Sequence, residues 1–307
     1  MVYVVFDLDA TLADISPIYY YIASLQIKKM LSGLMFSIFP INLERELDKA
    51  YSLFVKRILE QEQSDKPIGI LRPGILTIME KLFTLKKKGR ISNVIIYSNN
   101  SHLESLEFVR DLIHAHIGSK RLISQCIHRT HPLRNSENLE HPNMYPKTWK
   151  TLSTIIMNNG TSKIIMAKDV YFFDDLDHID LQNTLQNNYY KVPEYVCRTN
   201  STNDSRIMKI YSSVLEDAGV NLIQFGLYIT DIFSVNSIVD NFILADILSI
   251  MLFLSRYKHM SNSSIKETDD GITMMNDMID RIKMNTIKMT KRIKRARTFK
   301  KRRYTQR

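Results

Sequence analysis

Acidic residues directly follow two short apolar runs in this sequence of 307 residues. Asp7 and Asp9 come after the run VYVVF, and Asp174 and Asp175 come after the run VYFF. Such runs, rich in β-branched and aromatic residues, are typical of strands that are buried on both faces of a parallel sheet. Open α/β sheets bind ligands just outside the carboxyl ends of their strands. We therefore expect the four carboxylates to gather at one edge of a sheet.

A cluster of four carboxylates needs a compensating cation, because like charges a few ångströms apart raise one another's pKa. Side chains alternate along a strand, which predicts that Asp7 and Asp9 lie side by side on one face. Oxygen ligands without His or Cys nearby favour Mg²⁺, and its candidate ligands are Asp7, Asp9, Asp174 and Asp175. Such a site suits phosphoryl transfer, in which one carboxylate attacks phosphorus and another protonates the leaving oxygen. Mg²⁺ and a lysine would neutralise the charge on the phosphoryl oxygens.

The rest of the sequence predicts the elements that position these residues. Strands are expected at residues 2–6, 94–97, 123–127, 170–173 and 189–196. Pro193 makes the last of these an edge strand. Helices are expected at residues 17–63, with a break at Pro40, and at 75–87, 102–116 and 148–157. Strands that alternate with helices indicate an α/β fold with a doubly wound, mostly parallel sheet.

Four segments stand in an order that is typical of one enzyme superfamily. Residues 4–11 read VVFDLDAT, residues 95–99 read IIYSN, a lysine follows, and residues 171–175 read YFFDD. Over about residues 1–198 the sequence resembles the haloacid dehalogenase (HAD) superfamily. The resemblance implies a HAD-like phosphatase domain, in which residues 13–71 form a helical insertion after the first strand.

The resemblance also implies roles for individual residues. Asp7 would be the nucleophile and Asp9 the general acid and base. The residues that would bind the phosphoryl group are Thr11, Ser98, Asn99 and the lysine of the third motif. Mg²⁺ would be held by Asp7, the carbonyl of Asp9, and Asp174 or Asp175.

The lysine of the third motif is chosen by its position. Lys147 stands at an expected helix start, as the family's lysine does, and we prefer it. Lys150 would lie one turn inside the helix and remains the alternative. Lys163 and Lys168 lie too close to Asp174 to leave room for a helix between them.

Within the superfamily, the closest resemblance is to the phosphatases of the RNA polymerase II carboxy-terminal domain, the NLI-interacting-factor-like group. It rests on DLDxTL at residues 7–12 and on RPG at residues 72–74, and it implies a phosphoserine or phosphothreonine protein as substrate. Ala10 departs from the Glu or Asp that is usual in this group, and residues 13–71 are longer and more helical than expected. Divergent members with such additions look like those encoded by large DNA viruses.

Charge and composition divide the residues after 198 into a helical region, 199–280, and a basic tail, 281–307. Thirteen of the 42 Lys and Arg residues lie at 281–307, a segment without Asp or Glu. This basic tail is expected to contact RNA, DNA or another polyanion, or to act as a nuclear signal, although a solubilising tail has the same composition. Residues 199–280 are expected to form a helical C-terminal region, in which the apolar stretch 242–254 is too short to span a bilayer.

The expected compartment is intracellular, either cytoplasmic or nuclear, without membrane attachment or secretion. The two cysteines, Cys126 and Cys197, suit a reducing compartment, and the first basic residue is Lys28, so no charged signal region begins the sequence.

Other interpretations stay open at this point. The basic tail would also serve a nucleic-acid-end or nucleotide phosphatase, and a non-catalytic HAD-fold protein could retain the acids for binding or structure. His128, His131 and His141 lie in one irregular segment, but no thiolate accompanies them at zinc-finger spacing. Surface or phosphate-facing histidines are the favoured interpretation, and His178 is given no role.

Overall fold

The computed structural model describes residues 2–31, 41–134, 146–158, 165–197, 201–221, 225 and 270–284. Several features expected from the sequence fall outside these ranges. They are the helix break at Pro40, His141, Lys163, the apolar stretch 242–254 and residues 285–307 of the basic tail. Residues 281–284 belong to a helix over residues 270–284.

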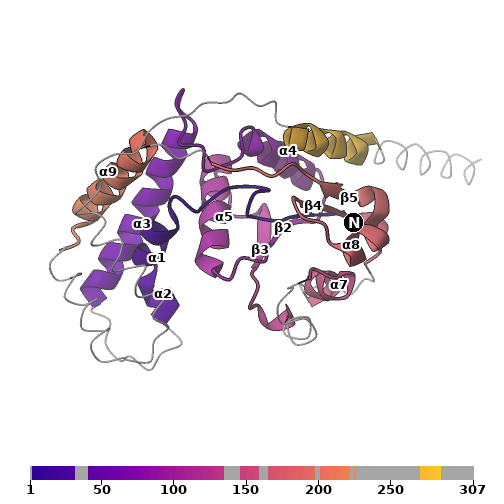
Figure 1. The fold of residues 1–307 in the computed structure, drawn as a ribbon, viewed down its shortest axis with the longest axis horizontal. Helices are drawn as coiled ribbons and strands as arrows, with labels where there is room; N and C mark the ends of the chain where they lie inside the picture. Colours follow the sequence, from indigo (N-terminus) through magenta and orange to yellow (C-terminus); the bar gives the residue numbers. More distant parts are fainter. Residues whose placement is uncertain are drawn as a thin grey trace, which may run out of the picture.

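A five-stranded parallel sheet forms the centre of the described chain (Figure 1). Its strands are β1 (Tyr3–Phe6), β2 (Asn93–Tyr97), β3 (Ile123–Ile127), β4 (Val170–Asp174) and β5 (Tyr189–Lys191). They lie in the order β3-β2-β1-β4-β5 and every pair is parallel, which confirms the expected α/β class. Phe6 at the end of β1 is paired with Phe173 in β4. The residues that follow these two, Asp7 and Asp174, are therefore neighbours at the carboxyl edge.

Helices cover both faces of the sheet, because alternate residues of each strand enter two separate cores. Val4 and Phe6 belong to the larger core, whereas Tyr3 and Val5 belong to the smaller one. The larger core is covered by α1 (Tyr19–Leu25), α3 (Ile41–Glu62), α4 (Ile75–Lys87), α5 (Leu103–Ile117), α9 (Ser201–Ala218) and the helix over residues 270–284. The smaller core is covered by α7 (Trp149–Asn158) and α8 (Ile179–Leu185).

The remaining elements are one short helix and three 3-10 turns among the described residues. A helix α2 (Ile27–Leu31) follows α1, and the 3-10 turns are η1 (Pro132–Arg134), η2 (Ala167–Asp169) and η3 (Gln186–Asn188). Within the described part of the chain, no helix is both long enough and apolar enough to cross a bilayer.

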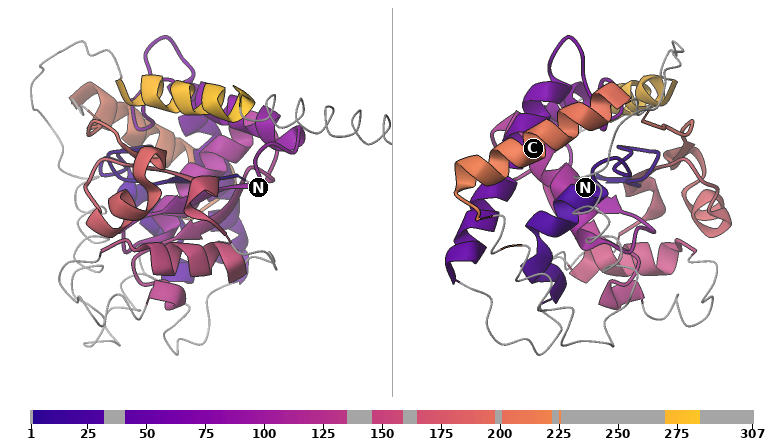
Figure 2. Two further views of the ribbon diagram at one scale, coloured as in Figure 1. Left: turned by 90° about the vertical axis from the view of Figure 1, so that its right-hand side faces the viewer. Right: turned by 60° about the vertical axis from the view of Figure 1, so that its left-hand side comes forward.

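The two ends of the expected insertion, residues 13–71, lie next to each other. Ala13 pairs with Leu71 in an antiparallel bridge, and the Asp14 N–H donates to the Ile70 carbonyl at 2.9 Å. Between these ends the chain forms α1, α2 and α3, and α9 packs along α3 (Figures 1 and 2). The return of the chain at Leu71 places the following Arg72 beside the loop that leaves β1.

The last strand is shorter than the sequence predicts. It is an edge strand, as expected, but it ends at Lys191 rather than at residue 196. Proline has no N–H to give to a sheet, and the carbonyl of Pro193 accepts from Arg72 Nη2 at 2.6 Å instead. The Tyr195 N–H then donates to the Ala10 carbonyl at 2.8 Å. The chain after β5 thus contacts the loop after β1 rather than extending the sheet.

The helix over residues 270–284 lies beside α4 (Figures 1 and 2). Its Met275 and Met278 are fully buried in the larger core, where they serve packing. Ile272 reaches Gly74, where a Cβ would lie 3.4 Å from its Cγ2. Gly74 has φ +83, a left-handed conformation that glycine adopts at little cost. This turn therefore depends on glycine for its conformation, whereas the space beside Ile272 would admit a Cβ.

Candidate functional site

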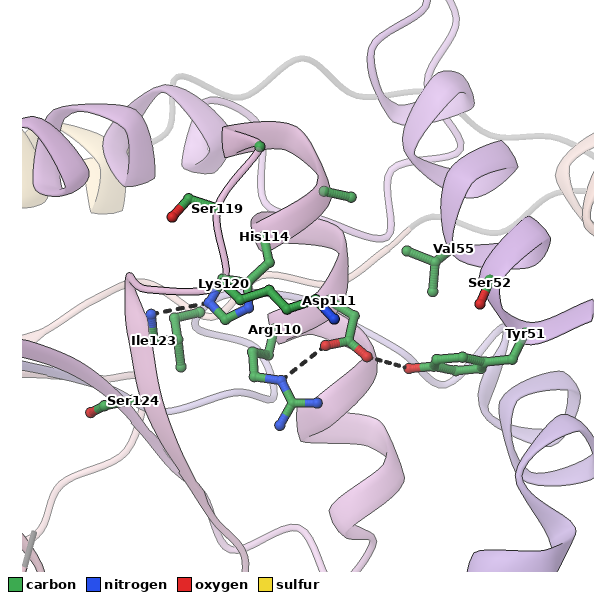
Figure 3. Close-up of a pocket in the computed structure, with 12 residues that line it drawn as sticks. Tyr51, Ser52, Val55, Arg110, Asp111, His114, Ser119, Lys120, Ile123 and Ser124 are labelled. Atoms are coloured by element: carbon green, nitrogen blue, oxygen red, sulfur yellow. Dashed lines mark hydrogen bonds and ion pairs between the residues drawn. The ribbon is translucent and has the colours of Figure 1, made fainter. Parts of the chain in front are cut away.

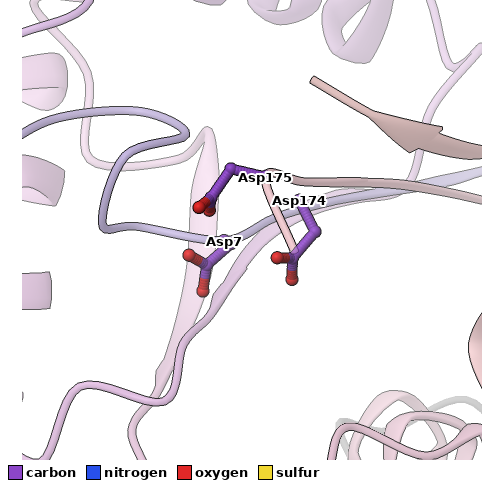
Figure 4. Close-up of side chains that lie close together, drawn as sticks. All are labelled: Asp7, Asp174 and Asp175. Atoms are coloured by element: carbon purple, nitrogen blue, oxygen red, sulfur yellow. The ribbon is translucent and has the colours of Figure 1, made fainter. Parts of the chain in front are cut away.

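Three carboxylates converge at the carboxyl edge of the sheet (Figure 4). Asp7 follows β1, Asp174 ends β4 and Asp175 comes next, and one oxygen of each lies within 4.8 Å of the others. Asp7 and Asp174 are buried, and the Asp7 N–H donates to the Phe173 carbonyl at 2.8 Å, which fixes the two strand ends together. A compact group of carboxylate oxygens of this kind, two of them from buried residues, could hold a metal ion.

Lys147 is the cation nearest to these acids. It lies just before α7 and is only 2 % exposed. Its Nζ donates to Asp7 Oδ1 at 2.5 Å and to Asp174 Oδ2 at 2.6 Å. The rings of Tyr97 and Phe172 each lie 5.7 Å from the same ammonium group and exclude water from it. Lys150, the alternative, is an exposed residue of α7.

One ammonium group does not balance three carboxylates in a buried site. Burial raises the pKa of Asp7 to about 7, and the charges of Asp174 and Asp9 act in the same direction against Lys147. Burial also acts to raise the pKa of Asp174, but Lys147 and the His178 ring outweigh it and lower that pKa. Burial and the charge of Asp174 raise the pKa of Asp175. The donor set therefore fits a hard divalent cation, which would supply the missing positive charge.

Asp9 has different partners from Asp7 and is not a member of the group of three. Its carboxylate accepts from Ser98 Oγ at 3.3 Å and from Asn100 Nδ2 at 3.1 and 3.2 Å. The alternation that places Asp7 and Asp9 side by side does not extend this far, because β1 ends at Phe6. Burial raises the pKa of Asp9, while the bonds from Asn100 and Ser98 oppose the rise.

The loop that carries Asp9 is closed by backbone hydrogen bonds. The Leu8 carbonyl lies 3.3 Å from the N–H of Thr11, 2.9 Å from that of Leu12 and 3.1 Å from that of Ala13. Ala10 has φ +57, in the left-handed region that residues other than glycine seldom adopt. A tight loop of this kind, rather than an extended strand, sets the direction of the Asp9 side chain.

The residues expected to bind phosphate lie at the same edge but are bonded to protein groups. Thr11 Oγ1 donates to Asp175 Oδ1 at 3.2 Å. Ser98 Oγ also accepts the Asn100 N–H at 3.1 Å, and Asn99 Oδ1 accepts from Arg134 Nη2 at 2.8 Å. Their contact with a phosphoryl group stays a prediction.

Arg72 holds the Asp9 loop from the outside. Its Nε donates to the Thr11 carbonyl at 2.7 Å, and its Nη2 donates to the carbonyls of Ala10 at 2.7 Å and Pro193 at 2.6 Å. The side chain is 2 % exposed and its guanidinium lies 5.4 Å from the Tyr195 ring centre. The planar fork of arginine suits this convergence of carbonyls, and lysine could not reproduce it. The RPG segment at residues 72–74 thus has a structural role next to the site.

Sequence reasoning missed two further residues of the site. Asn100 contacts Asp9, and only its place three residues after the end of β2 pointed to it. Arg134 is fully buried in η1, donates to the Ser98 carbonyl at 2.8 Å and lies 4.8 Å from the Tyr97 ring centre. Arg134 comes from an irregular segment whose sequence gives no sign of that contact.

A groove of about 630 Å³ lies elsewhere, between α3, α5 and the start of β3 (Figure 3). Its lining includes Tyr51, Asp111, His114 and Lys120, and none of the three clustered aspartates. His128 and His131, whose ring centres are 6.0 Å apart after β3, are also not members of the group that could hold a metal. The described chemistry is therefore concentrated at the carboxyl edge around Asp7.

Known proteins give no match to this chain: no protein-family model, no curated protein and no solved structure is similar to it. The sheet and the aspartate group are loosely compatible with a HAD-like fold and with a metal-dependent enzyme.

Proposed function

We propose that the chain is a Mg²⁺-dependent phosphomonoester hydrolase of the HAD type, acting through an aspartyl-phosphate. The observation that carries the proposal is the position of Lys147, whose ammonium group bridges Asp7 and Asp174 in a buried site. Asp7, Asp174 and Asp175 would hold Mg²⁺, with the carbonyl of Asp9 as a further ligand. When bound, the ion would supply charge stabilisation for the phosphoryl oxygens.

The residues then have distinct parts in two steps. An oxygen of Asp7 attacks phosphorus, the bond from phosphorus to the ester oxygen breaks, and Asp9 gives a proton to the departing alcohol. A water molecule next attacks the phosphorus of the aspartyl-phosphate and loses its proton to Asp9, which releases inorganic phosphate and restores Asp7. Lys147, Thr11, Ser98 and Asn99 would orient the phosphoryl group by charge and hydrogen bonds.

The substrate that we favour is a protein phosphorylated on serine or threonine. The segments DLDxTL and RPG resemble the phosphatases of the RNA polymerase II carboxy-terminal domain. The basic residues of 281–307 support a second candidate, a nucleic-acid-end or nucleotide phosphatase, and contact of this tail with RNA or DNA stays part of that proposal. Turnover of phosphopeptides, compared with that of 3′- and 5′-phosphorylated oligonucleotides, separates the two substrates.

Hydrolysis of p-nitrophenyl phosphate tests the enzyme class itself. We expect activity that requires Mg²⁺ and falls at least about 10³-fold in Asp7→Asn, because the amide is not a nucleophile. Asp111→Asn, at the distant groove, is the matched control and should stay within about threefold of the wild type. A folded wild-type protein without turnover on any of these substrates would favour a non-catalytic binding protein.

A further inference from the structure

His178 is a buried histidine directly beside the acidic group, and the proposed reaction does not use it. It lies four residues after Asp174, immediately before α8, and is 9 % exposed. Its Nδ1 accepts a long hydrogen bond, 3.5 Å, from the Lys147 N–H. In the neutral ring this leaves the proton on Nε2. That nitrogen lies 3.2 Å from Asp174 Oδ2, although without the alignment of a hydrogen bond.

The imidazole therefore connects the backbone of Lys147 to the carboxylate that Lys147 also contacts with its ammonium group. Asp174 Oδ2 faces both Lys147 Nζ at 2.6 Å and the His178 ring. Asp174 Oδ1 accepts the Leu176 N–H at 2.9 Å. Contacts on both oxygens restrict the rotation of the carboxylate, and Oδ1, which accepts one N–H, still has a lone pair for a cation.

The loop from Asp174 to His178 is itself held by β5. The Tyr189 hydroxyl donates to the Leu176 carbonyl at 2.6 Å and accepts the His178 N–H at 3.3 Å. One hydroxyl thus anchors both the residue that bonds Oδ1 and the residue that faces Oδ2. Neither His178 nor Tyr189 needs to touch a substrate to affect the site.

We infer that His178 is a positioning residue, which orients Asp174 and the start of α7 for cation binding. This inference rests on the proposed function, because it assumes that Asp174 is a metal ligand. Groups that orient a metal ligand typically change metal affinity about 10–100-fold when they are removed. The His178 ring is expected to act through its Nε2 side, which faces Asp174.

Direct binding of Mn²⁺, followed by the electron paramagnetic resonance of the free ion, tests this role without substrate. We expect His178→Ala to weaken binding at least about 10-fold. His178→Gln places an amide nitrogen near the position of Nε2 and should restore most of the affinity, whereas His178→Asn mimics only Nδ1 and should not. Tyr189→Phe should weaken binding about threefold through the loop. His116→Ala, at the C-terminal end of α5, is the control and should bind as the wild type does.

Thermal unfolding of each variant without metal shows that the fold is kept. The inference is overturned if folded His178→Ala binds Mn²⁺ as tightly as the wild type, or if Asn restores binding as well as Gln. Absence of Mn²⁺ binding in the wild type would instead overturn the proposed metal site, and the inference with it. The two failures are therefore distinguishable.

Discussion

Two groups of acidic residues in this molecule differ in how far neighbouring protein groups balance their negative charge. At the groove, Asp111 accepts Arg110 Nε at 2.9 Å on one oxygen and the Tyr51 hydroxyl at 3.0 Å on the other (Figure 3). At the carboxyl edge, the ammonium group of Lys147 bridges Asp7 and Asp174, and Asp175 lies within 4.8 Å of both without such a contact to Lys147. The first centre is satisfied within the protein, whereas the second keeps negative charge for a ligand to balance. Unbalanced charge in a buried site costs stability and marks a functional site.

The largest difference between the two centres is expected when the basic residue of each, Lys147 or Arg110, is replaced by methionine. Lys147→Met should lower kcat/KM about 10²–10³-fold, because a group that neutralises the phosphoryl oxygens is lost. It should also destabilise the metal-free protein by about 3–5 kcal/mol, since two buried carboxylates lose their partner. Mg²⁺ should return part of that stability, as measured by thermal unfolding with and without MgCl₂.

Arg110→Met is the matched change at the groove. It should cost about 1–3 kcal/mol, and Mg²⁺ should not restore that loss, because Asp111 stands apart from the metal ligands. Equal rescue of both variants by Mg²⁺ would contradict the distinction between the two centres.

Arg72→Lys tests whether the loop after β1 must be held in place. Lysine cannot reach the carbonyls of Ala10, Thr11 and Pro193 together, so we expect a loss of about 2–4 kcal/mol. Displacement of Asp9 should lower kcat/KM about 10–100-fold. Arg206→Lys is the control, because Arg206 Nη2 donates to the Lys66 carbonyl at 2.7 Å rather than to the loop after β1. Unchanged kinetics in folded Arg72→Lys would show that Arg72 is not needed to position Asp9.

The two centres should also respond oppositely to neutralisation of one acid. Asp111→Asn weakens the bonds from Arg110 and Tyr51 and should cost about 1–2 kcal/mol without loss of turnover. Asp175→Asn should raise the melting temperature of the metal-free protein, since the raised pKa of Asp175 means that folding disfavours its charge. Turnover should fall in Asp175→Asn. A lower melting temperature in that variant would mean that the cluster is not under electrostatic strain.

The smallest expected effect is a pH dependence at the groove. His114 Nε2 accepts the Ile123 N–H at 3.2 Å, and burial lowers the pKa of His114 to about 4. A depressed pKa means that the unfolded chain binds the proton more readily, so stability is complete above about pH 6.5 and declines toward pH 4. We expect a loss of about 1 kcal/mol over the first pH unit below 6.5, because a difference of one pKa unit corresponds to about 1.4 kcal/mol. Chemical denaturation of wild type and His114→Asn across this range measures it, and identical slopes would exclude the effect.

The sheet and the central acids could be predicted from sequence because the signals are local. Runs such as VYVVF and VYFF suit strands that are buried on both faces, and parallel pairing brings the residues after them together. Asp7 and Asp174 therefore meet as expected, and Lys147 reaches them because a helix begins directly after it.

The contacts of Asp9 could not be predicted from local sequence signals. They depend on a loop closed by the Leu8 carbonyl and held by Arg72, which is distant in sequence. Arg134 enters the site from an irregular segment, and the His178 ring accepts the backbone N–H of Lys147, which is 31 residues away in sequence. The spacing of apolar residues and the helix and strand propensities describe single elements. The contacts of Asp9, Arg134 and His178 depend instead on how separate loops pack against one another.

Addition of beryllofluoride, which binds carboxylates as a phosphoryl mimic, tests the central claim most directly. With Mg²⁺ present, fluorine NMR of the wild type should show a protein-bound signal that disappears on addition of EDTA and is missing in Asp7→Asn. Asp111→Asn should keep it. No bound signal in the folded wild type, or the same signal in Asp7→Asn, would contradict a metal-assisted phosphoryl site at Asp7.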